Sequence, residues 1–112
     1  MSCFNLILTR KPEIEHFKPV VDLEEHESLQ LMCSIRKGSK PISFEWLKDN
    51  HRIDEIQSVL NIINNPTSSI LSFENILSHH SGNYTCRASN PDGFDQSFTI
   101  IHVKGLLFIF CF

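Results

Sequence analysis

Residues 80–90 read HSGNYTCRASN, and this stretch decides the fold. Within it Tyr84, Cys86 and Ala88 alternate with polar or charged residues. Successive side chains on a β-strand point to opposite sides of the sheet, so the alternation predicts a strand over Asn83–Ser89 with these three residues facing inward. The NPDG run at positions 90–93 then predicts a hairpin turn into one more strand.

A second cysteine lies on an earlier strand of the same kind. Along Ser28–Arg36, Leu29, Leu31, Cys33 and Ile35 share one parity and are expected to face inward, while Met32 is expected to face outward. Trp46 is inward in the next strand, 13 positions after Cys33 (46 − 33), and Leu71 is inward in a later one. The expected strands are Glu13–Phe17, Val20–Leu23, Ser28–Arg36, Ser43–Lys48, Ile56–Ile63, Ser69–Glu74, Asn83–Ser89 and Phe94–Lys104, and the expected turns are 24–27, 49–50, 64–67 and 90–93.

Seven or more short strands without a helical stripe predict an all-β sandwich. The two sheets of a sandwich meet through their inner faces, and Cys33 and Cys86 both point inward from the middle of strong strands. We therefore expect a disulfide between the sheets, with Trp46 covering it. The bridge would close a loop of 53 positions (86 − 33) and contribute about 4 kcal/mol of stability on the chain-entropy model.

Size and composition limit the class of protein. The 112 residues suffice for one domain, and 41% hydrophobic and 21% charged residues are ordinary for a soluble globular domain. A net charge of −3 without a basic patch argues against nucleic acid or an anionic membrane as partner. We place the domain at residues 12–104 and treat 1–11 and 105–112 as segments outside it.

Cysteine usage and targeting point in different directions. Paired structural cysteines imply an oxidising compartment. Yet residues 1–11 lack the basic-then-apolar order of a secretory signal, and the apolar stretch Leu106–Phe112 is too short to span a bilayer. We therefore expect the chain to be part of a longer secreted or membrane-anchored protein. Cys3 and Cys111, near the chain ends, are expected to be unpaired.

These residues resemble an immunoglobulin domain of the I-set. The resemblance is carried by Leu71-x-Phe73-x-x-Ile76, by Gly82-x-Tyr84-x-Cys86 and by the tryptophan strand and turn Trp46-Leu47-Lys48-Asp49-Asn50. Tyr84, two positions before the second cysteine, matches the tyrosine corner of that family. The resemblance covers Pro12 to Lys104 and implies an immunoglobulin-like Greek-key sandwich whose core includes Trp46, Leu71 and Tyr84.

A narrower resemblance is to Dscam-like cell adhesion molecules, especially those of arthropods. It is carried by residues 80–90, 42–49 and 17–19. It implies several such domains in one chain, homophilic adhesion, neurite guidance and, in arthropods, immune recognition. Three positions depart from the family pattern: His80 stands where an arginine-paired Asp is usual, and His26 and Asn50 stand where Gly is usual.

The remaining polar residues do not form a catalytic or metal-binding pattern. Neighbouring strand residues such as His79 and His80 point to opposite faces, which suits chelation poorly, so we interpret them as a solvated loop pair. Ser81 lacks a nucleophile elbow. The acidic clusters Glu13/Glu15 and Asp22–Glu27 fit charged sheet edges better than paired catalytic carboxylates. We predict no enzymatic activity, no cofactor, no metal and no small-molecule substrate.

One modification motif is present. Asn83-Tyr84-Thr85 is an N-glycosylation sequon, and Asn83 has outward parity, opposite to Tyr84. Asn65-Pro66-Thr67 fails as a sequon because of its central proline. Asn83 is therefore the candidate glycosylation site.

Three functions compete. The first is an extracellular adhesion or recognition module of a multi-domain receptor, which binds a protein through a strand edge or through the outer face of the sheet that carries Cys86. The partner would be the same domain on another molecule if the charged edge near Lys18–Glu27 pairs with itself. The second is a spacer domain without a partner. The third is an intracellular muscle-type I-set domain, which the lack of a signal peptide favours and the cysteine pair and the sequon oppose.

Overall fold

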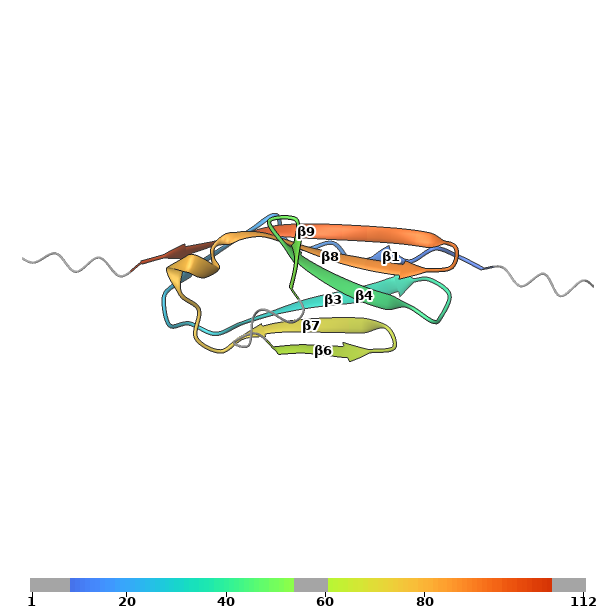
Figure 1. Cartoon of the computed structure of the whole chain (residues 1–112), viewed down its shortest axis with the longest axis horizontal. Helices are drawn as coiled ribbons and strands as arrows, with labels where there is room; N and C mark the ends of the chain where they lie inside the picture. Colours follow the sequence, from blue (N-terminus) through green and yellow to red (C-terminus); the bar gives the residue numbers. More distant parts are fainter. Residues whose placement is uncertain (1–8, 54–60, 106–112) are drawn as a thin grey trace, which may run out of the picture.

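The computed structural model describes residues 9–53 and 61–105, which form two β-sheets packed face to face (Figure 1). The smaller sheet has the strand order β1-β3-β7-β6 and the larger one β2-β9-β8-β4-β5. The strands are β1 (Glu13–Ile14), β2 (Val20–Glu24), β3 (Leu29–Lys37), β4 (Ser43–Lys48), β5 (His51–Arg52), β6 (Asn61–Asn65), β7 (Ser68–Phe73), β8 (Gly82–Asn90) and β9 (Gly93–Lys104). A short 3-10 helix, η1 (Ser78–His80), precedes β8. The predicted all-β sandwich is confirmed.

The core lies between the two sheets and contains the disulfide. Cys33 of β3 and Cys86 of β8 are bonded across the sandwich, with an S–S distance of 2.03 Å and a Cα–Cα distance of 6.3 Å. The predicted bridge is therefore confirmed. The buried apolar residues around it are Ile14, Leu31, Trp46, Ile53, Leu71, Phe73, Ile76, Tyr84, Ala88, Ile101 and Val103.

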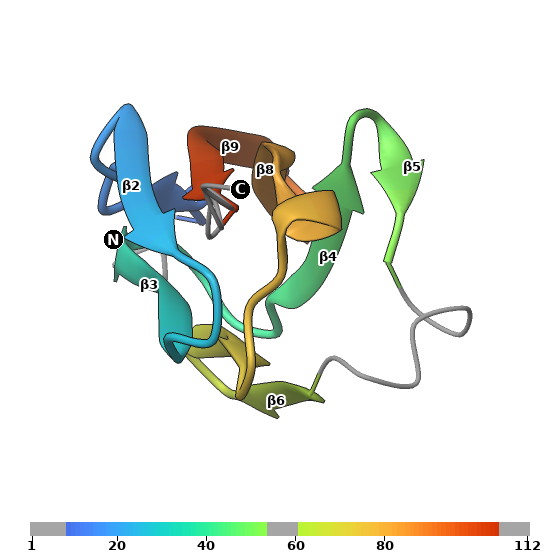
Figure 2. The ribbon, with the colours of Figure 1, turned by 90° about the vertical axis from the view of Figure 1, so that its left-hand side faces the viewer.

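The first two strands of the domain belong to different sheets. β1 pairs antiparallel with β3, whereas β2 pairs parallel with β9, and the larger sheet therefore ends at β2 on one edge and β5 on the other (Figure 2). The strand expected over Glu13–Phe17 covers only Glu13–Ile14, because the chain crosses to the other sheet after Ile14. Phe17 N–H donates to the Ser97 hydroxyl during this crossing, at 3.0 Å.

Two turns differ from the sequence-based expectation. Asp49 and Asn50 both have positive φ, 50° and 69°, the backbone of a tight hairpin turn, and this turn adds the unexpected strand β5. The expected turn 64–67 shrinks to two residues, because Asn64 and Asn65 belong to β6 and pair with β7. The Asn65 amide donates to the Ser68 hydroxyl across that turn, at 3.2 Å.

Several predictions fall on parts of the chain that lie outside the described residues. These are the first part of the strand Ile56–Ile63, the pairing state of Cys3 and Cys111, and most of the two segments assigned outside the domain. In the described ranges, no helix has the length and apolar character needed to cross a membrane.

Candidate functional site

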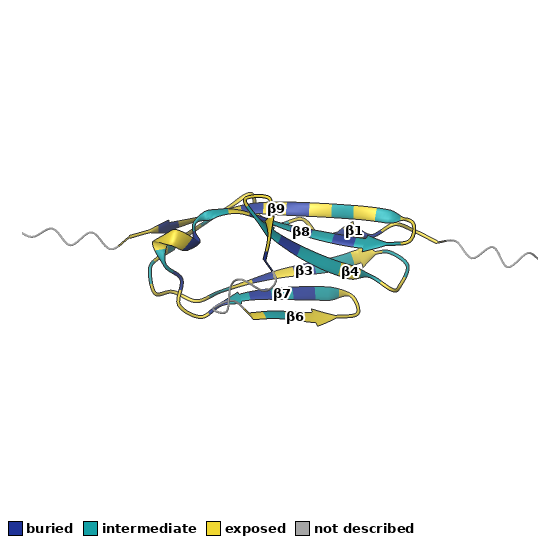
Figure 3. Cartoon of the chain, viewed as in Figure 1, coloured by how far each residue is buried: buried dark blue, intermediate teal, exposed yellow. Residues whose placement is uncertain are grey.

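The outer face of the larger sheet is the side of β8 opposite to the disulfide. Tyr84, Cys86 and Ala88 are buried on the inner side, so Asn83, Thr85 and the other residues of their parity point outward. Along β9 the same alternation separates buried from exposed residues (Figure 3). The face is continuous over β9, β8, β4 and β5.

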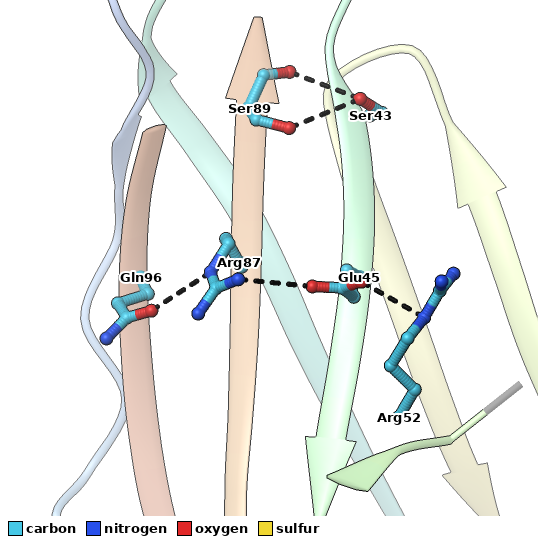
Figure 4. A network of polar contacts seen from close by, with 6 residues as sticks. All are labelled: Ser43, Glu45, Arg52, Arg87, Ser89 and Gln96. Carbon is cyan, nitrogen blue, oxygen red and sulfur yellow. Dashed lines mark hydrogen bonds and ion pairs between the residues drawn. The ribbon is translucent and has the colours of Figure 1, made fainter. Parts of the chain in front are cut away.

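A ladder of polar side chains crosses this face. Arg87 Nε donates to Gln96 Oε1 at 3.1 Å, and Arg87 Nη1 lies 3.4 Å from Glu45 Oε1 (Figure 4). Arg52 Nε lies 3.0 Å from the other oxygen of the same carboxylate, Oε2. The Glu45 carboxylate thus contacts two guanidinium groups, and the ladder crosses the four adjacent strands β9, β8, β4 and β5. Each of these half-exposed pairs contributes about 0–1 kcal/mol, so the ladder orders the surface more than it stabilises the fold.

Apolar side chains stand beside the ladder. Phe94 is 54% exposed, Phe98 54% and Ile100 43%, all on β9. The guanidinium carbon of Arg87 lies 5.4 Å from the centre of the Phe94 ring, within the range of a cation–π contact. Aromatic residues and arginine are enriched in the cores of protein interfaces, so this composition suits protein recognition.

The acidic clusters lie on edge strands. Glu13 is on β1 and Glu15 follows it, while Asp22–Glu27 covers the end of β2 and the turn after it. Glu27 accepts a hydrogen bond from Glu24 N–H at 2.7 Å, and Asp22 Oδ1 lies 3.2 Å from His102 Nδ1. Charge at a sheet edge discourages unspecific strand addition. In the described ranges, no group of three or more His, Cys, Asp or Glu residues could hold a metal ion.

The structure places the sequon on the outer face. Asn83 is exposed and lies opposite Ile100 of β9, and Thr85 lies opposite Phe98. The backbone of Asn83 bonds to Asp49 in both directions: its N–H donates to Asp49 Oδ1 at 2.9 Å and its carbonyl accepts from Asp49 N–H at 2.8 Å. Asp49 therefore holds the backbone of the strand at Asn83, while the Asn83 side chain points to solvent.

A close contact explains the glycine of the Gly82-x-Tyr84-x-Cys86 motif. A Cβ at Gly82 would lie 2.9 Å from Asp49 Oδ2 and 3.1 Å from Lys48 Cε. The Asp49 carboxylate cannot easily move away, because it accepts the Asn83 N–H. A side chain at Gly82 would therefore push the β4 turn away from β8.

His80 corrects the prediction of a solvated histidine pair. The residue is 4% exposed, and its Nδ1 accepts a hydrogen bond from Leu77 N–H at 2.8 Å. The pair lies in the helix η1, where the His79 and His80 rings approach to 4.3 Å, and not on a strand that would separate them. Burial lowers the pKa of His80 below its ordinary value, and the nearby positive charges of His79 and Lys48 act in the same direction.

Tyr84 joins η1 to β8. Its hydroxyl donates to the His80 carbonyl at 2.6 Å, which is the geometry of a tyrosine corner, and its ring packs edge-on against Phe73 at 5.4 Å. Burial raises the pKa of Tyr84 above its ordinary value, and the Asp49 carboxylate adds to this. His80 stands where the family usually has an Asp that pairs with an Arg, but His80 has no arginine partner among the described residues. Hydrogen bonds and ring contacts hold it in place instead.

A buried polar link joins the sheets, and the sequence pattern did not reveal it. Trp46 Nε1 donates to the Ser69 hydroxyl at 2.8 Å, and this hydroxyl donates to Asn64 Oδ1 at 2.5 Å. Ser69 is fully buried. Its inward parity was readable from the strand, but its role as acceptor for an indole on the opposite sheet was not. The described part of the chain leaves no buried side-chain nitrogen or oxygen without a hydrogen bond.

The comparisons with known proteins agree with this architecture. A family model described as an immunoglobulin domain matches residues 11–90. The chain is 30% identical over 93 residues, 83% of its length, to the cell adhesion molecule Dscam2 of Drosophila melanogaster. It is 34% identical over 79 residues, 70% of its length, to vascular endothelial growth factor receptor 3 of Danio rerio. It spans only 4% of the first relative and 6% of the second.

Solved structures give the same result for the fold. The Dscam1 Ig7 domain, isoform 5, superposes with a TM-score of 0.75 at 24% identity, covering 84% of this chain and 97% of that domain. The I-band fragment I67–I69 of titin superposes with a TM-score of 0.76 at 29% identity, covering 88% of this chain and 34% of the fragment. A cell adhesion molecule, a growth factor receptor and titin thus share similarity with this chain, so the fold alone does not distinguish between these kinds of protein.

Proposed function

We propose, since this chain belongs to the immunoglobulin domain family, that it is an extracellular adhesion or recognition module and that it acts by binding another protein. It would be one of several domains in a longer receptor. The similarity to a cell adhesion molecule over 83% of the chain carries this proposal. The name of the second relative, a growth-factor receptor, also supports a place at the cell surface.

The disulfide supports the extracellular compartment. Cys33 and Cys86 are fully buried and bonded to each other. Structural bridges of this kind persist in oxidising surroundings and are rare in the cytosol. The compartment in turn favours a recognition role, because an extracellular module meets other cells and soluble proteins.

We place a homophilic contact at the outer edge of β2, which no strand of the described ranges pairs with. Ile100 N–H donates to the Pro19 carbonyl, and Glu25 N–H donates to the Lys104 carbonyl. The backbone N–H and C=O groups of the odd-numbered residues along β2 therefore point toward β9. Pairing groups alternate along a strand, and the backbone groups of Val20 and Asp22 therefore face the open edge. Such an edge accepts an additional strand, and a second copy of β2 has the same length and charge pattern.

We propose a register of that contact in which opposite charges meet. An antiparallel pairing of two β2 strands centred on Val21 places Val20 opposite Asp22 of the second copy, and Lys18 opposite Glu24. Lys18 and Glu24 are both exposed, so two symmetric ion pairs would form. The contact is isologous, and it therefore closes as a dimer instead of growing into a fibre.

A charge swap tests this contact. Beads coated with the chain should aggregate, Lys18→Glu or Glu24→Lys alone should abolish aggregation, and the double swap should restore it. Lys37→Glu, on the exposed end of β3 in the other sheet, is the charge-matched control and should behave like the unmodified chain. Aggregation that survives both single swaps but fails with Arg87→Glu would move the contact to the polar ladder.

Two other functions remain candidates on specific grounds. A spacer domain predicts that no charge reversal on the edge or the outer face alters adhesion of the longer protein. An intracellular muscle-type domain is favoured by the likeness to titin I67–I69 at 29% identity. Mass spectrometry of the native protein under non-reducing conditions separates the compartments: free thiols at Cys33 and Cys86 would contradict the extracellular proposal.

A further inference from the structure

The sequon and an exposed apolar row lie together on the outer face. Asn83-Tyr84-Thr85 is the single Asn-x-Ser/Thr sequence of the chain without a central proline. In the sheet, Asn83 lies directly opposite Ile100, Thr85 opposite Phe98, and Val20 of β2 on the far side of Ile100. Val20 is 48% exposed, so an apolar row of Val20, Ile100 and Phe98 borders the sequon.

The Asn83 side chain is available for modification. It points outward, and the hydrogen bonds recorded for the residue come from its backbone N–H and carbonyl. Asp49 holds both of these groups, so the side-chain amide does not help to hold the strand. Thr85 lies two residues on and faces the same side, the arrangement that an extended sequon has on any strand.

The spacing brings the apolar row within reach of a sugar on Asn83. Cβ atoms of residues directly opposite on antiparallel strands are about 4.5–5.5 Å apart, and diagonal neighbours about 7–8 Å. Ile100 is the direct neighbour of Asn83 and Phe98 a diagonal one. The C–H faces of a pyranose ring and its acetyl methyl group are apolar, so their contact with these side chains removes apolar surface from water.

We propose that Asn83 carries an N-linked glycan whose first N-acetylglucosamine packs on Ile100 and Phe98. The inference rests on the proposed extracellular function, because the reaction takes place in the secretory pathway. The Asn83 amide nitrogen forms a bond to the anomeric carbon of a lipid-diphosphate-linked oligosaccharide. The bond from that carbon to the diphosphate oxygen breaks, and the amide proton is balanced by protonation of the released lipid diphosphate.

The glycan divides the outer face into two parts. It covers Ile100 and Phe98, while the Arg87–Glu45 ladder and Phe94 lie further along the strands and stay open. It projects from the face of the sheet, whereas the edge groups of Val20 and Asp22 point along the sheet. A partner is thereby kept from the middle of the face and directed to the β2 edge or to the ladder.

The first experiment tests attachment. The full chain, directed to the secretory pathway of animal cells by a cleavable leader, is analysed by mass spectrometry before and after peptide N-glycosidase. The unmodified chain and Thr85→Ser, which keeps the sequon, should carry the glycan. Thr85→Val, which keeps the shape but loses the hydroxyl, should not. A secreted, folded chain without glycan at Asn83 overturns the proposal.

The second experiment tests packing. An endoglycosidase trims the glycan to one N-acetylglucosamine, and the thermal unfolding midpoint is compared with that of Thr85→Val. The trimmed chain should unfold at a higher temperature and bind less of a hydrophobic dye. The paired variant Phe98→Thr/Ile100→Thr, made with and without the sequon, should lose this difference. The same difference in that variant would overturn the packing, as would dimerisation of the glycosylated chain through Ile100 and Phe98.

The outcomes keep this inference separate from the proposed function. A glycosylated chain that fails to aggregate beads refutes homophilic adhesion and leaves the glycan site intact. An unglycosylated chain that still aggregates beads refutes the glycan site and leaves adhesion intact. Thr85→Val should aggregate beads as the unmodified chain does, because the β2 edge does not depend on the glycan.

Discussion

Replacement of Ser69 by alanine tests the buried polar link between the two sheets. The Ser69 hydroxyl accepts the Trp46 indole N–H at 2.8 Å and donates to Asn64 Oδ1 at 2.5 Å. Trp46 is 2% exposed and Ser69 0%, so water cannot replace the lost hydroxyl without a rearrangement of the core. The alanine would leave a buried indole donor without a partner.

The expected loss of unfolding free energy follows from the unsatisfied indole N–H. An unsatisfied buried polar group costs about 1–3 kcal/mol. In a domain of about 100 residues, each kcal/mol shifts the unfolding midpoint by roughly 4–8 °C. We therefore expect Ser69→Ala to lower the free energy of unfolding by about 2 kcal/mol and the midpoint by roughly 10 °C.

Chemical denaturation followed by circular dichroism measures this cost in a double-mutant cycle with Trp46→Phe. The Trp46→Phe background has no indole N–H that could lose its acceptor. In this background Ser69→Ala should therefore lower the free energy of unfolding by less than half as much as in the unmodified chain. Ser72→Ala, on the opposite side of the same strand, is the matched control and should cost about 0.5 kcal/mol or less. An equal cost of Ser69→Ala in both backgrounds would falsify the argument, because the loss would then come from packing alone.

Three further changes have clear expected outcomes. Joint replacement of Cys33 and Cys86 by alanine should lower the free energy of unfolding by about 4 kcal/mol, since the bridge closes a loop of 53 residues; a loss below about 1 kcal/mol in denaturant titrations would contradict this. Burial lowers the pKa of His80 below the 6.5 of an exposed histidine, so the unfolded chain binds more protons in acid and stability should fall as the pH drops below 6.5. His80→Asn should flatten that slope between pH 7 and 5, and an unchanged slope would show that other groups cause it. Gly82→Ala should cost about 1–3 kcal/mol because its Cβ meets the Asp49 carboxylate. Asp49→Gly in the same chain should remove most of this cost, and thermal unfolding of the unmodified chain, the two single variants and the double variant measures it.

The candidate surfaces were only partly predictable. Parity along the chain indicated that Asn83 points outward, and the charge pattern indicated that Asp22–Glu27 lies on an edge. It did not show that Val20 would lie beyond Ile100. The turn at 90–93 sets the register that places Asn83 opposite Ile100, whereas β2 and β9 are far apart in the chain and no turn joins them to set their register.

The sequence by itself determined the properties that are local to one strand or set by a covalent bond. Alternation placed Cys33, Trp46 and Cys86 inward, and two inward cysteines in an all-β chain led to the bridge between the sheets. The tertiary structure alone decided the properties that depend on distant segments. Packing of η1 against Phe73 and Tyr84 buried a histidine that looked solvated, and four strands together built the ladder around Glu45. These outcomes depend on which side chains meet across strand pairs, and that choice is made by the packing of the whole core.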